Sequence, residues 1–566
     1  MFKQIFPVLQ WLPNYRPGWL KADVVAGLTL AAYAIPVALA YGSLAGLPSE
    51  VGLYCYMLGA VGYAFFGTSR QLAMGPTSAI SILVGASLAP LANGDAERYL
   101  ILASSTAVLV AVICLLAWLL KLSQIVNFIS EPILTGFKAG AALQIASTQL
   151  PKLFGVPSGG SNFFSRIWDL FHHWQEIQPA TLLVGGLALV LLVMGDRLWP
   201  SKPISLMVVI LAIVVMGITN LPEQGVKVVG EIPQGLPSFG MPHWSFSDLD
   251  SLLPLALACF LLSYIEGIST ARSFAIKHHY RINPEQELLA IGAANLAAGL
   301  GQGYPIAGGL SQSAVNEKAG AKTPLAIIIT ACIIAIVLLF FTGLFSNLPE
   351  AILGAVVLVA VKGLINIPEL QHLKKVAPLE FKVSLIALFG VLCFGVLQGV
   401  LLAAIASILF LIHIIAYPSS AVLGRIPGSD QFSDLERHPE NLAISGVLIY
   451  RINGPILYFN INNIESDLFN HLAQQQEPVE LVIFEMGTSP GIDTPAARWF
   501  KTLSQSLNQQ GITLKLVNAS GFVRDRLRAE GLEGEVGTFR RLDTVDSLIS
   551  EFNCQRCSDL PHTEND

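Results

Sequence analysis

The stretch LAMGPTSAISIL, residues 72–83, contains the features that interrupt a membrane helix. It lies in a region of long apolar runs, yet it places Gly75 and Pro76 side by side and follows them with Thr77 and Ser78. The stretch carries no charged residue. A membrane segment that interrupts its helix here offers only small hydroxyl groups and bare backbone to its surroundings.

The composition indicates a polytopic membrane protein. Of the 566 residues, 53% are hydrophobic and 13% are charged, and the mean hydropathy is +0.60. Ordinary soluble domains carry about 25% charged residues. The apolar runs match the ~20 residues that a membrane-spanning helix needs, and they stop near Pro418. The net charge of −6, without a basic stripe, excludes a nucleic-acid partner.

The apolar runs predict fourteen membrane segments, of which 71–90 and 305–317 are poor as simple helices. The N-terminal sequence lacks the pattern of a cleavable signal peptide, so we expect the first segment to be retained. The predicted segments are 24–45, 50–66, 71–90, 99–120, 124–148, 179–195, 203–220, 252–270, 286–302, 305–317, 324–345, 348–366, 381–397 and 399–417.

The charges of the connecting loops predict the orientation, because cytoplasmic loops are enriched in lysine and arginine. An even number of segments puts both termini on one side of the membrane. With that side cytoplasmic, twelve basic residues fall in inside loops, against four in outside loops. The inside residues are Arg70, Lys121, Arg197, Lys202, Arg272, Lys277, Arg281, Lys318, Lys322, Lys374, Lys375 and Lys382, and the outside residues are Arg98, Lys152, Arg166 and Lys227. We therefore expect cytoplasmic N- and C-termini in a plasma membrane or bacterial inner membrane.

The stretch QGYPIAGGLSQSAVN, residues 302–316, repeats the interrupted pattern of residues 72–83. Pro305 again follows an apolar segment, and small or hydroxyl residues come after it. The two interruptions fall in the third and tenth segments, seven apart in a chain of fourteen. Because seven is odd, the second half of the membrane region enters the membrane inverted. Interrupted segments at corresponding positions of two repeats mark the binding site of a transporter.

The two prolines predict a pair of half-helices that meet near the middle of the membrane. Proline suits the first position of a helix, so we expect Pro76 and Pro305 to begin half-helices. Each start leaves unpaired N–H groups and about half a positive charge, which favours an anion. The predicted donors are Thr77 and Ser78 at one start, and Ile306 and Ala307 at the other. The alternative is that each proline is an ordinary kink, which membrane helices tolerate.

The eighth segment contains an acidic residue, Glu266, in an apolar context. Ser263 and Thr270 share its helical face. An intramembrane carboxylate is costly and is a functional candidate, here for carrying a proton together with the anion. The alternative is that Glu266 pairs with Arg272 near the cytoplasmic end.

Two further positions are weaker candidates. Lys138 and Glu131 share a face of the fifth segment, where pairing with each other or snorkelling to the membrane surface is favoured over a ligand role. Tyr33 precedes Pro36 in the first segment and could line the anion site, although an ordinary kink at Pro36 is equally compatible with the sequence.

The C-terminal part alternates between strands and helices, which predicts a small cytosolic α/β domain. GVLIYRINGPILYFNI, LVIFEM and ITLKLVN are typical of strands, and ARWFKTLSQSLNQQ and ASGFVRDRLRAEG are typical of helices. Cys554 and Cys557 form a C-x-x-C pair without a second pair at zinc-site spacing, so we predict no metal.

Several of these stretches together resemble the sulfate permease family of anion transporters, whose relatives include prestin and pendrin. The resemblance is carried by GLTLAAYAIPVALAYGSLAGLPSEVGLY, GTSRQLAMGPTSAIS, ELLAIGAANLAAGL and GGLSQSAVNEKAGAKTPLA, between residues 10 and 420. Residues 438–553 resemble the STAS domain that follows in that family. We therefore divide the chain into an N-terminal segment (1–20), a transport domain (21–420), a STAS domain (438–553) and a tail (554–566).

The resemblance implies two inverted repeats of seven segments and a homodimer. It also implies a core domain (segments 1–4 and 8–11) that moves as an elevator against a gate domain (segments 5–7 and 12–14). The family's anion lies between the third and tenth half-helices, which places it at Thr77, Ser78, Ala307 and Gly308. The coupling acid of the family corresponds to Glu266.

The chain departs from the family at Gln312 and corresponds to a regulatory position of related proteins at Thr494. Many members carry arginine where this chain has Gln312, so the site has less fixed positive charge to offset a divalent anion. In the STAS region, GIDTPAA aligns Thr494 with the phosphorylated residue of related anti-sigma antagonists. The alternative at Thr494 is a helix start that is capped by Asp493.

We conclude from the sequence that the chain is a secondary anion transporter, coupled to protons, for sulfate or a similar oxyanion. Bicarbonate or dicarboxylate transport, with Na⁺ as a driving ion, is the alternative within transport. A sensor or scaffold that is centred on the STAS domain and no longer transports is a third hypothesis. An enzyme is excluded by the lack of a metal cluster, a nucleophile triad or a phosphate loop, and H⁺ or Na⁺ is the only cofactor that we expect.

Overall fold

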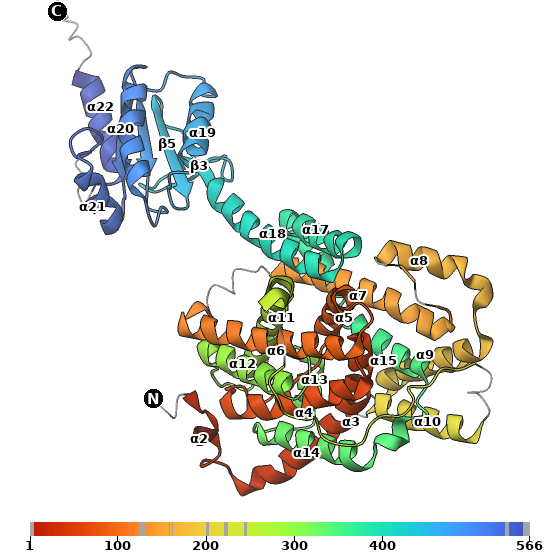
Figure 1. The fold of residues 1–566 in the computed structure, drawn as a ribbon. Helices are drawn as coiled ribbons and strands as arrows, with labels where there is room; N and C mark the ends of the chain where they lie inside the picture. The colour runs from red at the N-terminus through yellow and green to blue at the C-terminus, as the bar shows by residue number, and fades with distance from the viewer. Residues whose placement is uncertain are drawn as a thin grey trace, which may run out of the picture. The chain divides into compact units, whose positions relative to one another are not determined.

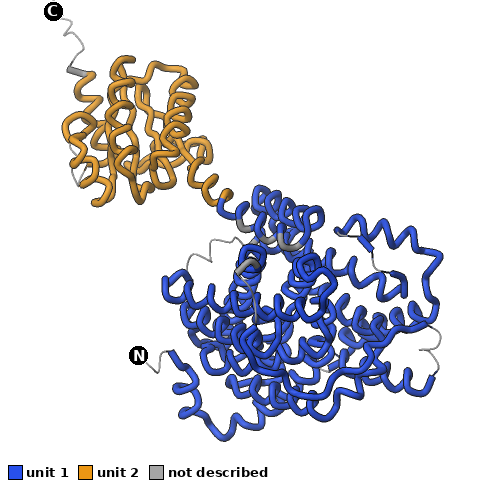
Figure 2. The backbone as a smooth tube through the Cα atoms, in the orientation of Figure 1, with its two compact units in different colours: residues 1–408 blue, residues 409–566 orange. Residues whose placement is uncertain are grey.

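The computed structural model describes residues 5–123, 131–157, 159–160, 162–199, 203–219, 225–242, 246–537 and 543–558. The chain forms two compact units, residues 1–408 and residues 409–566 (Figure 2). Residues 124–130 of the predicted fifth segment and residues 559–566 of the predicted tail lie outside the described residues.

The first unit is built from helices and one short two-stranded ladder (Figure 1). Its strands are β1 (Met74–Gly75) and β2 (Ala307–Gly308). Its helices, with α18 continuing past residue 408, are α2 (Val8–Trp11), α3 (Leu20–Leu44), α4 (Ser49–Phe66), α5 (Ser78–Ala92), α6 (Ala96–Leu119), α7 (Glu131–Phe154), α8 (Phe163–His172), α9 (Pro179–Leu198), α10 (Ile204–Ile218), α11 (Phe246–Lys277), α12 (Pro284–Leu300), α13 (Leu310–Lys318), α14 (Leu325–Phe340), α15 (Glu350–Lys362), α16 (Ile367–Val376), α17 (Pro378–Phe394) and α18 (Val396–Ala416).

Every predicted membrane segment overlaps one of these helices. The sequence did not predict α2, α8 and α16, because these helices are too short, at four to ten residues, to stand out as membrane-spanning apolar runs. Among the described residues, five helices are both long and apolar enough to cross a membrane. They span Pro17–Leu44, Ala96–Leu119, Pro179–Leu198, Asp248–Lys277 and Glu350–Val376. Shorter apolar helices accompany them, and the number of crossings stays a prediction.

The helices of the first unit pack as two groups. In one group, α12 packs against α4 and α6, α14 packs against α3 and α4, and α11 packs against α5 and α6. In the other group, α7 packs against α15 and α17, and α9 packs against α10 and α15. The groups meet where α10 and α15 contact α3 and where α7 contacts α5. This partition is the predicted division into a core and a gate.

Small residues allow the helices of the core to approach closely. A Cβ atom added to Gly52 of α4 would lie 1.9 Å from the carbonyl oxygen of Ala38 in α3, so only glycine fits at this contact. Pro36 does not interrupt α3, which is continuous from Leu20 to Leu44. The prediction of an interrupted helix at Pro36 is therefore wrong, and the alternative, a proline within an unbroken helix, agrees with the structure.

The second unit contains a five-stranded sheet in the order β4-β3-β5-β6-β7. β5, β6 and β7 are parallel, whereas β3 is antiparallel to both β4 and β5. The elements are β3 (Ser419–Arg425), β4 (Phe432–Asp434), β5 (Val447–Asn453), α19 (Ile461–Ala473), β6 (Leu481–Glu485), α20 (Thr494–Asn508), β7 (Thr513–Val517), α21 (Gly521–Ala529) and α22 (Val545–Ser558). β5, β6, β7, α20 and α21 overlap the stretches predicted as strands and helices, but residues 454–460 of the first predicted strand form only an isolated bridge at Ile456. β3, β4, α19 and α22 were not predicted, and β3 and β4 extend the sheet to before residue 438.

Candidate anion site

The two interrupted segments meet in the ladder between β1 and β2. Met74 lies opposite Gly308 and Gly75 lies opposite Ala307, and the two strands are antiparallel and fully buried. Opposing residues of antiparallel strands have Cα atoms about 4.5–5.5 Å apart. Because each strand is followed by a helix, α5 and α13 leave the ladder in opposite directions. Their N-terminal ends therefore face each other, as the sequence predicts.

The helices begin later than the prolines predict. α5 begins at Ser78 after an extended Thr77, and α13 begins at Leu310 after an extended Gly309. The prediction that Pro76 and Pro305 start the half-helices is therefore wrong. The buried ladder takes up the residues around them, and proline fixes only φ, which suits extended backbone as well as a helix.

The N–H groups available to a ligand shift accordingly. The Ile306 N–H donates to Asn295 Oδ1 at 2.9 Å, and Ala307 lies within the ladder. The prediction that Ile306 provides a free donor is therefore wrong. The first turn of a helix has no internal acceptors for its N–H groups. At the second half-helix these groups belong to Leu310, Ser311 and Gln312, because Ser313 makes the first internal bond.

Neither half-helix start is capped by its own N-cap residue. Thr77 and Gly309 occupy the N-cap positions, and neither makes a side-chain capping bond. Other helices of the chain are capped; Asp95 accepts two N–H groups of α6, and Asn283 accepts two of α12. Uncapped N–H groups at two facing helix starts make a site for a negatively charged ligand.

One face of α13 holds the extended segment that leads to α5. Gln312 Nε2 donates to the Pro76 carbonyl at 2.6 Å, and Asn316 Nδ2 donates to the Gln71 carbonyl at 3.0 Å. Between them, the Ala73 N–H donates to Ser313 Oγ at 2.9 Å. All three side chains are buried. These bonds fix the position of one half-helix start relative to the other.

A cavity of about 360 Å³ lies at the two helix starts. Of the predicted site residues, Tyr33, Thr77, Ser78, Glu266 and Thr270 line it. Pro76, Pro305, Ala307 and Gly308 do not line it, although the ladder that they flank or form holds the wall in place. Leu310 at the start of α13 also lines the cavity and is 60% exposed, so this end of α13 is open to a ligand.

The charged groups in the lining are Lys138, Glu266 and Glu369. Lys138 and Thr77 line the same cavity as Glu266. Among the described residues, Glu266 forms no ion pair with Arg272, so the alternative pairing is not present. Ser263 turns away from the cavity, and its hydroxyl donates to the Ile306 carbonyl at 2.8 Å.

Two tyrosines of α3 complete the polar lining. The Tyr41 hydroxyl faces Ser78, and the Tyr33 hydroxyl faces Ser311. The sequence patterns do not single out Tyr41, Ser311 or the position of Lys138 in the cavity lining. Tyr41 was detectable because it lies two turns after Tyr33 on the same helix. The sequence favours pairing of Lys138 with Glu131, which shares its helix face, over a ligand role. The Glu131 side chain lies outside the described part of the structure, so this pairing stays a prediction.

A second cavity, of about 540 Å³, adjoins the first. Both are lined by Tyr33, Ser311, Ala360 and Gly363. The second cavity also reaches Lys318 at the end of α13 and Asp196 near the end of α9, and both residues are exposed. These helix ends belong to the predicted cytoplasmic side. The anion site is therefore accessible from that side in this structure.

In the second unit, Thr494 begins α20 and Asp493 caps the helix. Asp493 Oδ1 accepts the Ala496 N–H at 2.9 Å, and its Oδ2 accepts the Tyr458 N–H at 2.9 Å. This is the helix-start arrangement that the sequence offered as the alternative. Within the described residues, no group of three or more potential metal ligands is present.

The comparisons with known proteins agree with this architecture. Residues 20–387 match the sulfate permease family, and residues 438–545 match the STAS domain. A probable sulfate transporter of Mycobacterium tuberculosis is 34% identical over 548 residues, which cover 96% of this chain and 98% of the relative. The probable sulfate transporter 3.3 of Arabidopsis thaliana is 32% identical over 546 residues, which cover 93% of this chain and 86% of the relative.

Solved structures with the same fold were also found. The murine anion transporter Slc26a9 in its inward-facing state aligns with a TM-score of 0.87 and 22% identity, over 97% of this chain and 94% of its own. The transmembrane domain of a cyanobacterial bicarbonate transporter, BicA, aligns with a TM-score of 0.61 and 22% identity, over 70% of this chain and 98% of its own. At these identities the likeness concerns the fold.

Proposed function

The chain belongs to the sulfate permease family, whose members are anion transporters and not enzymes, and we propose that it is a proton-coupled secondary transporter of sulfate or a similar oxyanion. The observation that carries the proposal is the pair of uncapped helix starts, at Ser78 and Leu310, which face each other across a cavity. Each start provides N–H groups and about half a positive charge. An oxyanion suits this arrangement because several of its oxygens can accept these N–H groups together.

The choice of sulfate is supported by relatives that match nearly the whole chain. The relatives in Mycobacterium and Arabidopsis are named as probable sulfate transporters. Because Gln312 is neutral, Lys138 is the only fixed cation among the described residues that line the cavity. One lysine does not balance the charge of a divalent anion. The rest of the compensation therefore comes from the two helix starts and from protonation of Glu266.

Proton coupling follows from the charge balance of the cavity. With Lys138, Glu266 and Glu369 all ionised, one positive and two negative charges give a lining of net charge −1. Protonation of Glu266 brings this net charge to zero, and the repulsion between Glu266 and the anion is removed. A proton and an anion then favour each other's binding, because a binding coupling is reciprocal.

The position of the cavity between the two helix groups supports an elevator movement. The core group provides Thr77 at the N-cap position of α5, Glu266 of α11 and Ser311 of α13. The gate group provides Lys138 of α7 and Gly363, which follows α15. The complete anion seat lies on the core. Movement of the core past the gate would carry the bound anion, its donors and Glu266 together. The cavity that reaches Lys318 represents the inward-open arrangement of this cycle.

We further propose that the protein works as a homodimer in a plasma membrane or bacterial inner membrane, with both termini cytoplasmic. Light scattering of the purified full chain checks the dimer. Protease protection of the C-terminal unit in inside-out vesicles checks the orientation, because a cytoplasmic unit is cleaved only when it faces outward.

Uptake into proteoliposomes tests the function. The full chain is reconstituted, and uptake of labelled sulfate, bicarbonate and succinate is compared under an imposed pH gradient, an imposed Na⁺ gradient and no gradient. We expect sulfate to accumulate under the pH gradient. Accumulation of bicarbonate or succinate under a Na⁺ gradient would support the alternative substrate, and no uptake of any anion would support a sensor or scaffold.

A further inference from the structure

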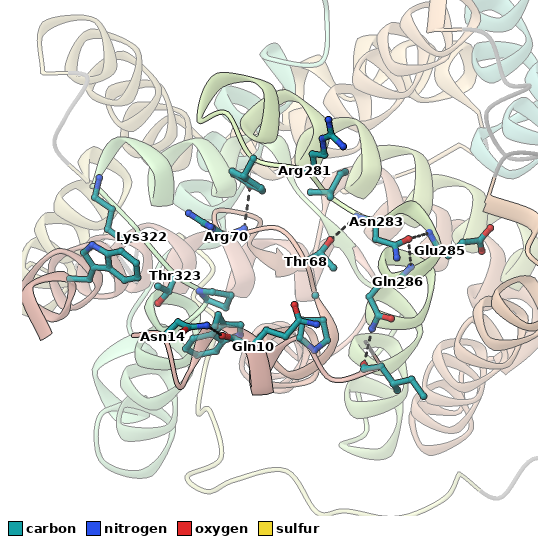
Figure 3. Close-up of a pocket in the computed structure, with 18 of the residues that line it drawn as sticks. Gln10, Asn14, Thr68, Arg70, Arg281, Asn283, Glu285, Gln286, Lys322 and Thr323 are labelled. Atoms are coloured by element: carbon teal, nitrogen blue, oxygen red, sulfur yellow. Dashed lines mark hydrogen bonds between the residues drawn. The ribbon is translucent and has the colours of Figure 1, made fainter. Parts of the chain in front are cut away.

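A third cavity, of about 860 Å³, lies away from the anion seat (Figure 3). It is lined by the end of α4, the end of α6, the connection from α11 to α12, the start of α14 and the segment before α3. These helix ends all belong to the predicted cytoplasmic side. The cavity shares no lining residue with the two cavities of the transport path.

Three cations from three different connections line this cavity. Arg70 follows α4, Arg281 precedes α12, and Lys322 precedes α14, and all three side chains are exposed. None of them forms an ion pair with a carboxylate of the described residues. Figure 3 shows the three cations on one rim of the cavity, with Gln10 and Asn14 across from them.

The charge of the cavity is positive overall. Glu285 is the only carboxylate among the described residues of the lining, so three cations and one acid give these residues a net charge of +2. Glu285 Oε1 accepts the Ser123 hydroxyl at 2.6 Å, whereas its Oε2 is buried without a hydrogen-bond partner in the described residues. The acid reduces the positive field at one side of the cavity but does not neutralise it.

The cations are held in place by neighbouring groups that leave their charge unpaired. The Arg70 guanidinium lies over the Tyr280 ring, 5.1 Å from its centroid. The backbone N–H of Arg70 donates to the Tyr280 hydroxyl at 3.2 Å. The Lys322 N–H donates to Asp23 Oδ1 at 2.7 Å, which fixes the backbone but leaves the ammonium free. Both cations are therefore positioned for an external anion.

The lining also contains three tryptophans and an unused donor. Trp11, Trp19 and Trp118 line the cavity, and tryptophan is typical of the boundary between membrane and water. The Trp11 Nε1–H is buried and has no acceptor among the described residues. A buried indole N–H normally finds an acceptor, so this group points to a ligand oxygen.

We propose that this cavity binds a phosphate group, held by Arg70, Arg281 and Lys322 and assisted by the Trp11 N–H. Basic pockets between membrane helices on the cytoplasmic side suit the headgroups of anionic lipids. A phosphate carried by a lipid and a soluble phosphate offer the same chemistry to these residues. The bound phosphate would link the ends of α4, α12 and α14, all of which belong to the core. The proposal does not depend on which anion the protein transports.

Lipid binding to the full-length protein tests this site. Native mass spectrometry counts phosphatidylglycerol and phosphatidylcholine of matched acyl chains bound to the detergent-purified protein. We expect phosphatidylglycerol to bind about tenfold more tightly than phosphatidylcholine. The triple variant R70Q/R281Q/K322Q should lose this preference. The control variant K374Q/K375Q/K382Q removes three exposed cations of the same predicted face outside the cavity and should keep it.

A second arm distinguishes the source of the phosphate. Inorganic phosphate in the millimolar range is expected to raise the melting temperature of the wild type but not of R70Q/R281Q/K322Q. A response to inorganic phosphate without a preference for phosphatidylglycerol would identify a soluble ligand for the same site. If the triple variant does not fold, two single variants replace it in both measurements. K322Q removes one charge, and W11F removes the indole N–H but keeps an aromatic ring.

Two results would overturn the proposal. One is a triple cavity variant that binds both phosphatidylglycerol and inorganic phosphate as the wild type does. The other is a control variant that loses the lipid preference as fully as the cavity variant, because the preference would then come from the general charge of this face.

Discussion

At the scale of single residues, the proposed proton coupling rests on Glu266. Its side chain lines the anion cavity together with Thr77 and Lys138. An ionised carboxylate in this place repels an anion. A protonated carboxyl group does not, and its O–H can donate a hydrogen bond to the anion. Glu266 is therefore suited to link the binding of a proton to the binding of an anion.

Replacing Glu266 with glutamine should separate anion binding from proton coupling. E266Q carries no titratable group, so we expect the pH gradient to stop driving sulfate accumulation, while sulfate binding persists. Labelled uptake into proteoliposomes measures the first effect, and equilibrium binding in detergent measures the second. E369Q removes an equal charge from a gate helix in the same cavity and should retain coupling. Undiminished proton-driven accumulation in E266Q would refute the coupling role.

Gln312 is the second residue with a defined task, because it connects the two half-helices. Q312M keeps the approximate volume but leaves the Pro76 carbonyl without its donor. An unpaired buried polar group costs about 1–3 kcal/mol, so we expect a lower melting temperature and weaker sulfate binding. Q149M replaces a buried glutamine of α7 outside the cavity and should leave sulfate affinity unchanged. Equal affinities of Q312M and the wild type would show that this bond does not position the seat.

The residue scale also shows what the sequence could predict about the site. Thr77, Ser78, Glu266, Thr270 and Tyr33 were predicted from hydroxyl, acid and proline patterns, and all five line the cavity. The role of Lys138 was not predictable in the same way. A cation that shares a helix face with an acid has a local partner in the sequence, and only the packing of α7 against α5 brings it to the anion site.

At the scale of elements, the ladder of β1 and β2 determines where the half-helices begin. The sequence predicts helix starts at Pro76 and Pro305, and the structure places them at Ser78 and Leu310. The interrupted pattern alone cannot reveal a ladder of two residue pairs, because β1 and β2 are too short for strand periodicity. The head-to-head arrangement was predictable because it depends only on the number of segments between the two interruptions.

The ladder requires glycine at Gly75. A Cβ atom at this position would lie 2.5 Å from the Tyr56 ring and 3.1 Å from Gln312 Oε1. We expect G75A to destabilise the protein by about 1–3 kcal/mol through overpacking, and to weaken sulfate binding by displacing Gln312. Thermal unfolding and equilibrium binding measure these effects.

A matched control for this prediction exists in α9. A Cβ atom added at Gly186 meets nothing within 4 Å, so G186A should leave both the melting temperature and sulfate affinity close to those of the wild type. A G75A protein that behaves like G186A would mean that the ladder tolerates a side chain and does not set the geometry of the seat.

At the scale of the whole molecule, the chain consists of two units, and the second begins within the last membrane helix. Asn460 Nδ2 donates to the Ile415 carbonyl at 3.0 Å, and Asn463 Nδ2 donates to the Ala416 carbonyl at 2.9 Å. These carbonyls belong to the last turn of α18, where backbone acceptors have no partner inside the helix. Side chains of the α/β domain thus cap the end of α18.

Removing this cap should loosen the end of α18. Asn460 is buried, and N460A leaves the Ile415 and Pro455 carbonyls without their donor. We expect faster amide hydrogen exchange in residues 409–417 of N460A, measured by mass spectrometry. N470A changes an exposed asparagine of the same helix and should exchange as the wild type does. Unchanged exchange in N460A would indicate that the cap does not stabilise this connection.

Most of the large-scale architecture was predictable, because membrane crossing and sheet formation leave strong periodic signals. The membrane segments, the core and gate groups, and the order of strands after residue 446 follow from apolar runs and from family resemblance. The first two strands of the sheet could not be predicted in this way. β3 and β4 lie before residue 438, and β3 follows an apolar helix so closely that composition does not separate them.

The central claim is that the anion lies between the starts of α5 and α13, and a selenate-bound structure tests it most directly. Selenate resembles sulfate in shape and charge, and its selenium atom can be located by anomalous scattering. We predict one selenium peak in the cavity lined by Thr77, Ser78 and Ser311, with oxygens within hydrogen-bond distance of the N–H groups of both helix starts. A cavity without selenium, in crystals whose protein binds selenate in solution, would contradict the account.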